Sequence, residues 1–168
     1  MKVYSQISNP DIFQKTVISI GSFDGLHTGH QKIFKTMKEK SKNTQKTIAI
    51  TFFPTPQSIL NPNNFKGHLN SKEEKIDKVK ELGVDILYIL KFDDKIKKMT
   101  AKNFLKIIIR KFNPELFIVG YNHCFGYKKE GDSDFLKKYK KKYNYKVVDI
   151  PELKSSNKIK ISSTTIRN

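Results

Sequence analysis

The sequence predicts an α/β fold, built on an open, mainly parallel sheet of about five strands with helices on both faces. Short runs of apolar and β-branched residues alternate with segments whose apolar residues recur at helical spacing. The runs carry few polar residues, which is typical of strands covered on both faces. No repeat, linker or low-complexity tract divides the 168 residues, so we expect one domain over 1–168.

The elements follow in order along the chain. The predicted strands are 16–20, 46–53, 85–91, 115–120 and 145–150. Helical spacing begins at Gly29, Ser71, Thr100 and near 133, so a helix is expected after each of the first four strands. Ser71 with Glu74 has the pattern of a capping box, and Thr100 is a helix-capping residue. This alternation is typical of a Rossmann-like fold.

The net charge of +17 raises the question of a nucleic-acid partner. Only two of the 33 basic residues are arginines, Arg110 and Arg167, and the lysines are spread along the chain. Proteins that read base sequence usually rely on arginine for bidentate contacts to guanine. We therefore expect a solvated lysine surface and no nucleic-acid partner. Such a surface would still attract a polyphosphate ligand.

Cellular context is indicated by what the chain contains. No apolar run approaches the length of a membrane span, and residues 1–10 lack the apolar core of a secretory signal. The single cysteine, Cys124, excludes internal disulfides and thiolate-rich metal sites. We expect a cytoplasmic protein with no membrane partner. The sequence is silent on oligomeric state, and a monomer is the working hypothesis.

Unusual residues gather where predicted strands end. Segments 21–30, 54–56, 120–131 and 160–167 are rich in Gly, Pro, His, Ser or Thr, and each follows a strand. Parallel strands bring these ends to one rim of the sheet, where α/β proteins bind ligands. The longer stretch 54–70 is expected to be a functional loop.

The first of these segments places Gly25, Thr28 and Gly29 at a strand-to-helix turn. Free backbone N–H groups and the helix dipole favour an anion there, and His27 and His30 would add donors. Zinc would need a third ligand, from Asp24 or His123. The residues alone leave anion binding, metal binding and plain packing open.

Four motifs carry a resemblance to a known family. GSFDGLHTGH (21–30) and ISSTTIR (161–167) resemble the two signatures of the HxGH nucleotidyltransferase superfamily. TFFPTP (51–56) and VGYNHCFGYKKEGD (119–132) resemble segments of bacterial FAD synthetases. The resemblance runs from about residue 15 to Arg167, and it implies transfer of AMP from ATP to FMN.

The resemblance also implies roles for residues. His27 and His30 would donate hydrogen bonds to ATP phosphates in a direct in-line transfer, and Arg167 would neutralise the leaving pyrophosphate. Glycine in the motif would let phosphate approach the backbone. The ATP-binding residues implied are Gly21, Ser22, Phe23, Asp24, Gly25, Gly29, Gly120, Ser162, Ser163 and Thr164. Mg²⁺ would bridge the phosphates with few protein ligands.

The flavin side is assigned by the other two motifs. The FMN-binding residues implied are Pro54, Pro56, Asn122, Phe125 and Gly126. Asn122 and His123 stand where the family usually has Asp-Phe, so the aromatic contact at 123 is in question. Cys124 replaces a common Arg, and we expect an inert, buried thiol. We assign no role to His68.

Alternatives remain from other classes. Family members usually continue into a riboflavin kinase domain, and we expect no flavokinase activity in this chain. Another HxGH adenylyl- or cytidylyltransferase would use a different phosphorylated acceptor, such as pantetheine phosphate or glycerol phosphate. A flavin- or nucleotide-binding module without catalysis would not need both signatures intact.

Overall fold

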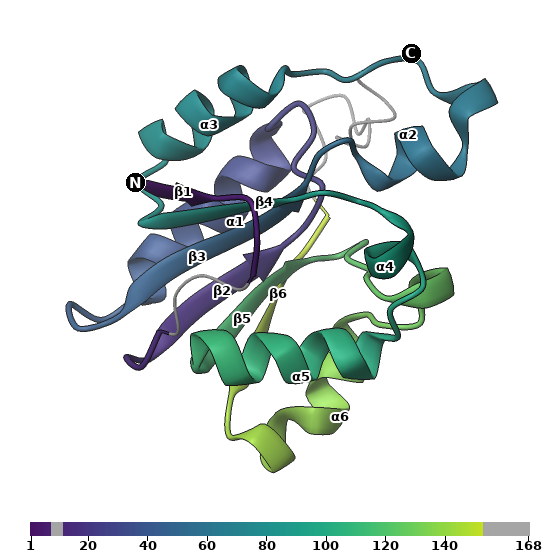
Figure 1. Cartoon of the computed structure of the whole chain (residues 1–168). Coiled ribbons are helices and arrows are strands. Elements are labelled where there is room, and N and C mark those ends of the chain that lie inside the picture. Colours follow the sequence, from purple (N-terminus) through teal and green to yellow (C-terminus); the bar gives the residue numbers. More distant parts are fainter. Residues whose placement is uncertain (8–11, 153–168) are drawn as a thin grey trace.

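The fold rests on one parallel sheet. A computed structural model of the chain describes residues 1–7 and 12–152 (Figure 1). In this part of the chain six strands pair in the order β1-β4-β3-β2-β5-β6, with every pairing parallel. The strands are β1 Lys2–Tyr4, β2 Thr16–Ile20, β3 Lys46–Phe52, β4 Ile86–Leu90, β5 Pro114–Gly120 and β6 Lys146–Ile150.

The predicted α/β architecture is confirmed, with one strand more than expected. The additional strand, β1, is three residues long and lies at the sheet edge beside β4. Its Tyr4 ring stacks on that of Tyr88, with centroids 5.2 Å apart. A run this short has no readable periodicity, and it forms because β4 offers backbone groups to pair with.

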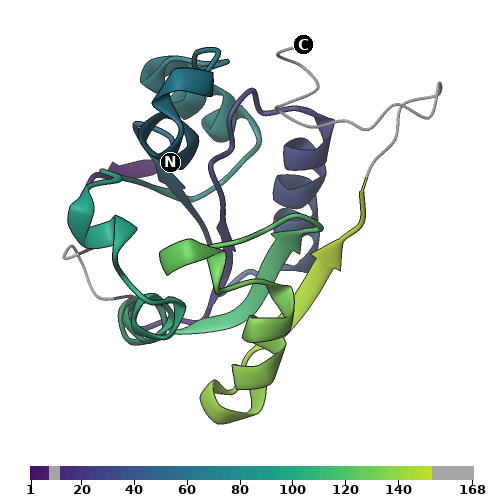
Figure 2. The ribbon, with the colours of Figure 1, turned by 90° about the vertical axis from the view of Figure 1, so that its right-hand side faces the viewer.

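Helices cover both faces of the sheet, as predicted (Figure 1, Figure 2). Helices α1 (Thr28–Lys40) and α3 (Lys72–Glu81) pack on one face, where Val17 of β2 lies with Met37 and Val79. Helices α5 (Ala101–Phe112) and α6 (Ser133–Tyr143) pack on the other, where Ile18 lies with Ile108 and Leu136. Neighbouring residues of one strand therefore belong to different cores.

Helix starts follow the predicted caps. Ser71 Oγ accepts a hydrogen bond from the Glu74 N–H at 3.1 Å, and the Glu74 carboxylate accepts one from the Ser71 N–H at 2.8 Å. Thr100 caps α5 by accepting from the Asn103 N–H at 3.2 Å. Both caps satisfy backbone donors that a helix start would otherwise leave unpaired.

The stretch 54–70, predicted as a loop, contains two short helical turns. These are α2 (Pro56–Leu60) and the 3₁₀ turn Pro62–Asn64. Each has a proline in its first turn, where its fixed φ suits a helix and its missing N–H costs nothing. Neither turn buries a residue, so no apolar periodicity announces it. The turns α4 (Asp94–Lys97) and Tyr127–Lys129 are likewise short.

Strand order places a crevice near the middle of the sheet. From β2 the chain runs outward through β3 and β4, and then crosses to β5 and β6 on the other side. The connections therefore diverge between the carboxyl ends of β2 and β5, the position where open α/β sheets bind ligands. Among the described residues, none of the helices has the length and apolar character needed to cross a bilayer.

Candidate active site

A cavity of about 440 Å³ lies at the carboxyl ends of the central strands. The segment after β2, α2 with its preceding residue, and the turn after β5 all line it. These are three of the four segments that the sequence places on one rim. The fourth, 160–167, lies outside the described residues.

Half of the predicted ATP residues line one cavity, together with both signature histidines and two predicted FMN residues. The cavity is lined by Gly21, Ser22, Phe23, Asp24, His27, His30, Gly120, Asn122 and Pro56. Gly25 lies in the loop before α1 and Gly29 in the first turn of α1, and neither lines the cavity; Pro54 does not line it either. Phe125 and Gly126 line an adjoining cavity. Outside the described residues lie Ser162, Ser163, Thr164 and Arg167.

The loop 21–27 has an unusual backbone, maintained by packing. Phe23 and Leu26 have φ of 44° and 42°, and Gly25 has φ of 77°. L-residues rarely adopt the left-handed region, so such a run persists only where the surroundings hold it. Phe23 is 1% exposed and Leu26 is 3% exposed, so both side chains are held within the core.

The segment before α3 contacts this loop through Leu69, an arrangement that we call the clasp. Asp24 Oδ1 accepts a hydrogen bond from the Leu69 N–H at 3.1 Å. A Cβ at Gly25 would lie 2.7 Å from Leu69 Cδ1. At Gly29 it would lie 3.0 Å from His27 Cε1. Contacts within the chain therefore favour glycine at both positions, more strongly at Gly25, where φ is also positive, in addition to any approach of a phosphate.

The two histidines lie at the start of α1. His27 is the N-cap and His30 the third helical residue. Their rings stack with centroids 3.7 Å apart and an interplanar angle of 24°. The His30 ring also packs edge-to-face against the ring of Phe23, with centroids 5.4 Å apart, and this contact holds its orientation. The left-handed Phe23 thus sets the orientation of His30.

Burial keeps both imidazoles neutral at pH 7. It lowers the pKa of His30 to about 3, with smaller contributions from the charges of His27 and Lys75. Burial also lowers the pKa of His27. In the described part of the chain, neither Nδ1 has a hydrogen-bond partner. A neutral imidazole donates through one nitrogen and accepts through the other.

The N-terminus of α1 favours an anion. Its first turn contains no acidic side chain, so its N–H groups and dipole are not compensated by a carboxylate there. The described residues contain no group of three or more His, Cys, Asp or Glu side chains able to hold a metal ion. Of the alternatives left open by the sequence, the geometry favours anion binding.

His123 is a third imidazole lining this cavity. Burial lowers its pKa to about 4, opposed by a hydrogen bond with the Ile20 backbone and by the charges of Asp132 and Asp149. Its ring packs against that of Phe125, with centroids 5.5 Å apart. The histidine therefore makes an aromatic contact within the chain at this position.

Lys75 is a site residue that the sequence reasoning missed. Although charged, it is 1% exposed, and its Nζ donates to the Ser22 carbonyl at 2.7 Å. Burial lowers its pKa to about 8. The available signal was its place one helical turn before Val79, on the inward face of a capped helix.

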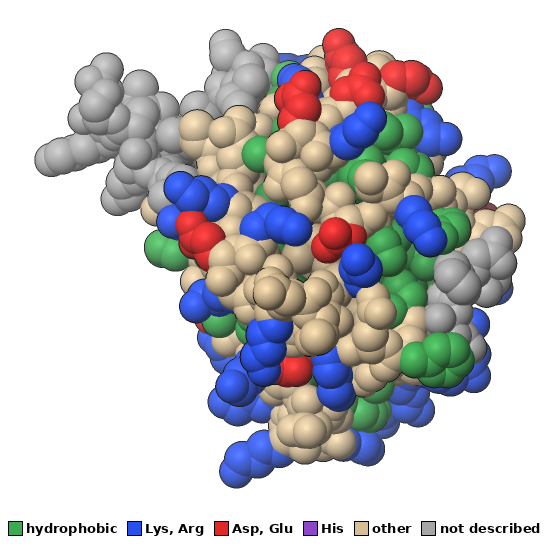
Figure 3. Space-filling model, turned by 90° about the vertical axis from the view of Figure 1, so that its left-hand side faces the viewer, with side chains coloured by type: hydrophobic (Ala, Val, Ile, Leu, Met, Phe, Trp, Pro, Cys, Tyr) green, Lys and Arg blue, Asp and Glu red, His purple; other side chains and the backbone are tan. Residues whose placement is uncertain are grey.

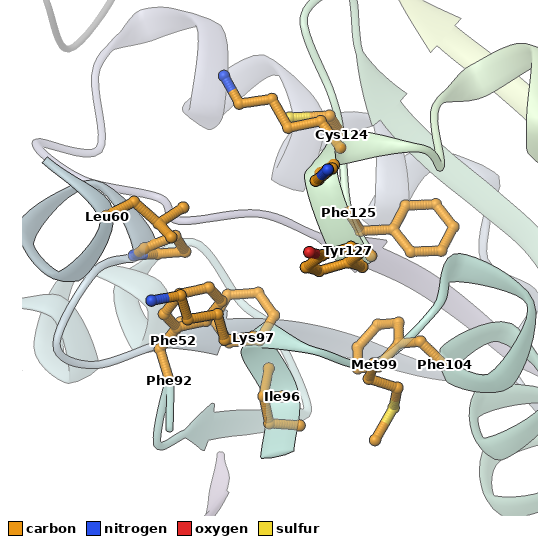
Figure 4. A pocket seen from close by; sticks show the side chains of 14 residues that line it. Phe52, Leu60, Phe92, Ile96, Lys97, Met99, Phe104, Cys124, Phe125 and Tyr127 are labelled. Carbon is orange, nitrogen blue, oxygen red and sulfur yellow. The ribbon is translucent and has the colours of Figure 1, made fainter. Parts of the chain in front are cut away.

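A second, apolar cavity of about 370 Å³ adjoins the first (Figure 4). Aromatic side chains from four segments converge on it, among them Phe52, Phe92, Phe104, Phe125 and Tyr127. Phe52, Pro56, Leu60, Cys124 and Lys129 line both cavities. The prediction of a buried thiol is wrong, because Cys124 is exposed at this junction. Cys124 comes directly after a turn in which the His123 N–H donates to the Gly120 carbonyl. His123 lines the first cavity.

Surface charge agrees with the solvated lysine surface expected from the sequence. On the face in Figure 3, basic side chains are interspersed with acidic, neutral and apolar ones. Some ion pairs of the described residues are local, such as Lys35–Glu39 at 3.9 Å within α1, and others join separate segments, such as Lys42–Glu115 at 3.2 Å.

Comparisons with known proteins agree with these motifs. The FAD synthetase family profile matches residues 9–165. A Buchnera aphidicola (subsp. Schizaphis graminum) protein named bifunctional riboflavin kinase/FMN adenylyltransferase is 38% identical over 99% of this chain and 54% of its own length. A Listeria monocytogenes protein of the same name is 32% identical over 90% of this chain and 48% of its own. The chain spans about half the length of these curated relatives.

Solved structures show the same fold. A Streptococcus pneumoniae chain described as a macrolide-efflux protein superposes with a TM-score of 0.83 at 27% identity, over 98% of this chain and 55% of its own length. A Francisella tularensis pantoate-beta-alanine ligase superposes with a TM-score of 0.68 at 17% identity, over 100% and 73%, which speaks for the fold alone. With the profile match over 9–165 and the 38% identity, the chain belongs to the FAD synthetase family.

Proposed function

We propose that this chain transfers AMP from ATP to FMN, giving FAD and pyrophosphate. The observation that carries the proposal is the junction of two unlike cavities at one rim of the sheet. One offers a helix N-terminus and imidazole donors, which suit phosphate. The other is apolar and lined by aromatic rings, which suit a planar ring system. FMN carries both a phosphate and such a ring.

This placement supports a direct transfer between the two substrates. An oxygen of the FMN phosphate attacks the α-phosphorus of ATP, the bond from that phosphorus to the β-phosphate oxygen breaks, and pyrophosphate leaves. No protein nucleophile is needed. His27, His30 and the N–H groups at the start of α1 would stabilise negative charge developing on the phosphate oxygens.

The acceptor would lie across the junction. The flavin ring would occupy the aromatic cavity beside Phe125 and Gly126, with its phosphate directed toward Asn122. Thr55, whose Oγ1 is buried without a partner in the described part of the chain, lines the phosphate side. Pro54 lines neither cavity. Its proposed role in FMN binding is therefore indirect, through the position of the adjacent Thr55.

Mg²⁺ fits this site as an ion held by substrate. Asp24 is the only acid among the described lining residues, and its Oδ1 already accepts from the Leu69 N–H. Mg²⁺ keeps several waters and binds readily to phosphate oxygens. When bound it would neutralise phosphate charge, while the imidazoles orient the phosphates.

The remaining assignments extend beyond the described residues. Ser162, Ser163 and Thr164 are proposed to bind the β- and γ-phosphates, and Arg167 to neutralise pyrophosphate, because their motif matches the family's second signature. The cytoplasm is the proposed compartment, supported by the single cysteine.

A direct assay tests the proposal. The protein is incubated with FMN, ATP and Mg²⁺, and the flavins are separated by chromatography; FAD is expected. Product from pantetheine phosphate or glycerol phosphate, with no FAD from FMN, would overturn the assignment of the acceptor.

A further inference from the structure

One carbonyl oxygen links three segments of the chain beside the cavity of about 440 Å³ that His27 and His30 line, which we call the phosphate cavity. The Ser22 carbonyl accepts a hydrogen bond from Lys75 Nζ of α3 at 2.7 Å and another from Thr51 Oγ1 of β3 at 2.9 Å. The residues are far apart in sequence, by 53 positions for the lysine and 29 for the threonine. Both donors are shielded from solvent, because Thr51 is 0% exposed and Lys75 is 1% exposed.

This carbonyl stands where the loop turns from regular to left-handed backbone. The Gly21 N–H still continues the sheet ladder by donating to the Ile50 carbonyl at 3.0 Å. Phe23, the next residue after Ser22, already has φ of 44°. Its ring meets the edge of His30, so a shift at Ser22 would pass to His30 through a single side chain. The two hydrogen bonds therefore hold the start of the segment that presents the imidazoles.

A lysine at this position lowers the stability of the fold. Its burial disfavours the charged amine, and it lies in the first turn of α3, where the helix dipole also opposes a cation. An apolar side chain would pack there without either penalty. In return, the amine supplies a hydrogen-bond donor that reaches from α3 to the Ser22 carbonyl, and it places a positive charge close to His30.

We propose that Lys75 is a positioning residue for adenylyl transfer, one that holds the Ser22 carbonyl and through it the left-handed loop that places His30. The inference rests on the proposed function of this site. Lys75 does not line either cavity, so it acts through the loop and not by contact with substrate.

The charge of Lys75 has a second effect on the same site. The charge of Lys75 acts on two histidines of neighbouring segments, His30 of α1 and His68 of the segment before α3, while α3 itself carries both acidic and basic side chains. Its positive charge contributes to the lowered pKa of His30 and of His68. A neutral residue at 75 would raise the pKa of His30, because a neighbouring cation no longer opposes its protonation.

Steady-state kinetics of FAD formation test the proposal with four proteins: wild type, Lys75→Met, Lys75→Arg and the control Lys80→Met. Met is an unbranched side chain that replaces the apolar stem of Lys without its charge or donor, whereas Lys80 is an exposed lysine of the same helix. We expect Lys75→Met to lower kcat by about 10- to 100-fold with little change in KM, as for misplaced transition-state groups. Lys75→Arg should retain more activity than Lys75→Met, and Lys80→Met should match wild type.

A double-mutant cycle with Thr51→Val separates positioning from general stability. Both donors act through one carbonyl, so the losses in kcat from Thr51→Val and Lys75→Met should not add. NMR titration of the histidine rings gives a readout independent of turnover, in which the pKa of His30 should be higher in Lys75→Met. Should Lys75→Met fail to fold, Lys75→Arg and Thr51→Val carry the test.

The outcomes are distinguishable from failure of the proposed function. If wild type forms no FAD, adenylyl transfer is wrong, and Lys75 is then judged by the titration of His30, whose pKa should be higher in Lys75→Met than in wild type. If wild type is active and a folded Lys75→Met keeps kcat within about twofold of it, the positioning role is overturned. Additive losses in the cycle would also contradict it.

Discussion

The paired imidazoles at the start of α1 resist protonation more than exposed histidines do. With the pKa of His30 lowered to about 3 and that of His27 also lowered, both rings are neutral at pH 7. Neutral rings donate to phosphate by hydrogen bonding, without the cost of burying a charge when no substrate is bound. The helix N-terminus and substrate-bound Mg²⁺ would then supply the electrostatic attraction.

Removing one of these donors tests its role. We expect His30→Ala to lower kcat for FAD formation by about 10²–10³-fold, the size typical of losing one transition-state donor. Phe34→Leu is a matched control, since it disturbs the same aromatic cluster through Phe23 without removing a donor. Unchanged turnover in a folded His30→Ala protein would leave His30 a packing residue.

The buried imidazole also predicts how stability depends on pH. The unfolded chain protonates this histidine near 6.5, whereas the folded chain does so only at about 3. Between these values the unfolded state binds more protons, so the free energy of unfolding should fall as pH is lowered from 6.5 toward 3. Thermal unfolding measured from pH 7 to pH 4 should show a shallower decline in His30→Ala than in wild type. Parallel curves would contradict the lowered pKa.

At the scale of elements, α1 is a helix whose start is left free for a ligand. Whereas α3 has Glu73 and Glu74 in its first turn, α1 has no acid there. Acids at that point would stabilise the helix through its dipole. Their absence agrees with a polyphosphate completing the helix start.

A charge introduced at this helix start should separate stability from function. Thr28→Glu is expected to raise the free energy of unfolding by roughly 0.3–1 kcal/mol. It should also raise KM for ATP about tenfold, which corresponds to roughly 1.4 kcal/mol of repulsion. Thr28→Gln is the neutral control, expected to do neither. Thermal melts and steady-state kinetics measure the two effects, and an unchanged KM would argue against phosphate at this end of α1.

The clasp between the signature loop and the segment before α3 is a second element-scale feature. Gly25 and Gly67 both have positive φ, but only Gly25 has a close neighbour, Leu69 Cδ1 at 2.7 Å from the position of a Cβ. We expect Gly67→Ala to cost about 1–2 kcal/mol from backbone strain alone, and Gly25→Ala to cost more. Chemical denaturation measures both. Gly25→Ala should recover part of its loss when combined with Leu69→Ala, and equal losses in the two single variants would contradict the clasp.

At the scale of the whole molecule, the two cavities meet at residues from distant segments. Cys124 lies at this junction and is the chain's single cysteine. A bulky maleimide should therefore label one site, block FAD formation, and react more slowly when FMN is present. Cys124→Ser should remain active and resist the reagent. Full activity after stoichiometric labelling would place the acceptor elsewhere.

Much of the fold could be predicted from local patterns. Strand runs, amphipathic spacing and caps depend on residues a few positions apart, and the capping box at Ser71 and the cap at Thr100 are confirmed. The short turns in 54–70 and strand β1 escaped prediction because they bury little or span too few residues for a period to show. The exposed Cys124 escaped it because residue type says little about which side of an irregular turn faces solvent.

The sequence by itself determined the βα order, the helix caps, and the placement of two histidines at a helix start beyond the first long strand. It also placed the site segments on one rim, because parallel strands align their carboxyl ends. Only the tertiary structure decided that Lys75 supports Ser22 across 53 positions, and that an aromatic cavity adjoins the phosphate cavity. Periodicity reports which face of an element is apolar, whereas such contacts depend on how separate elements pack together.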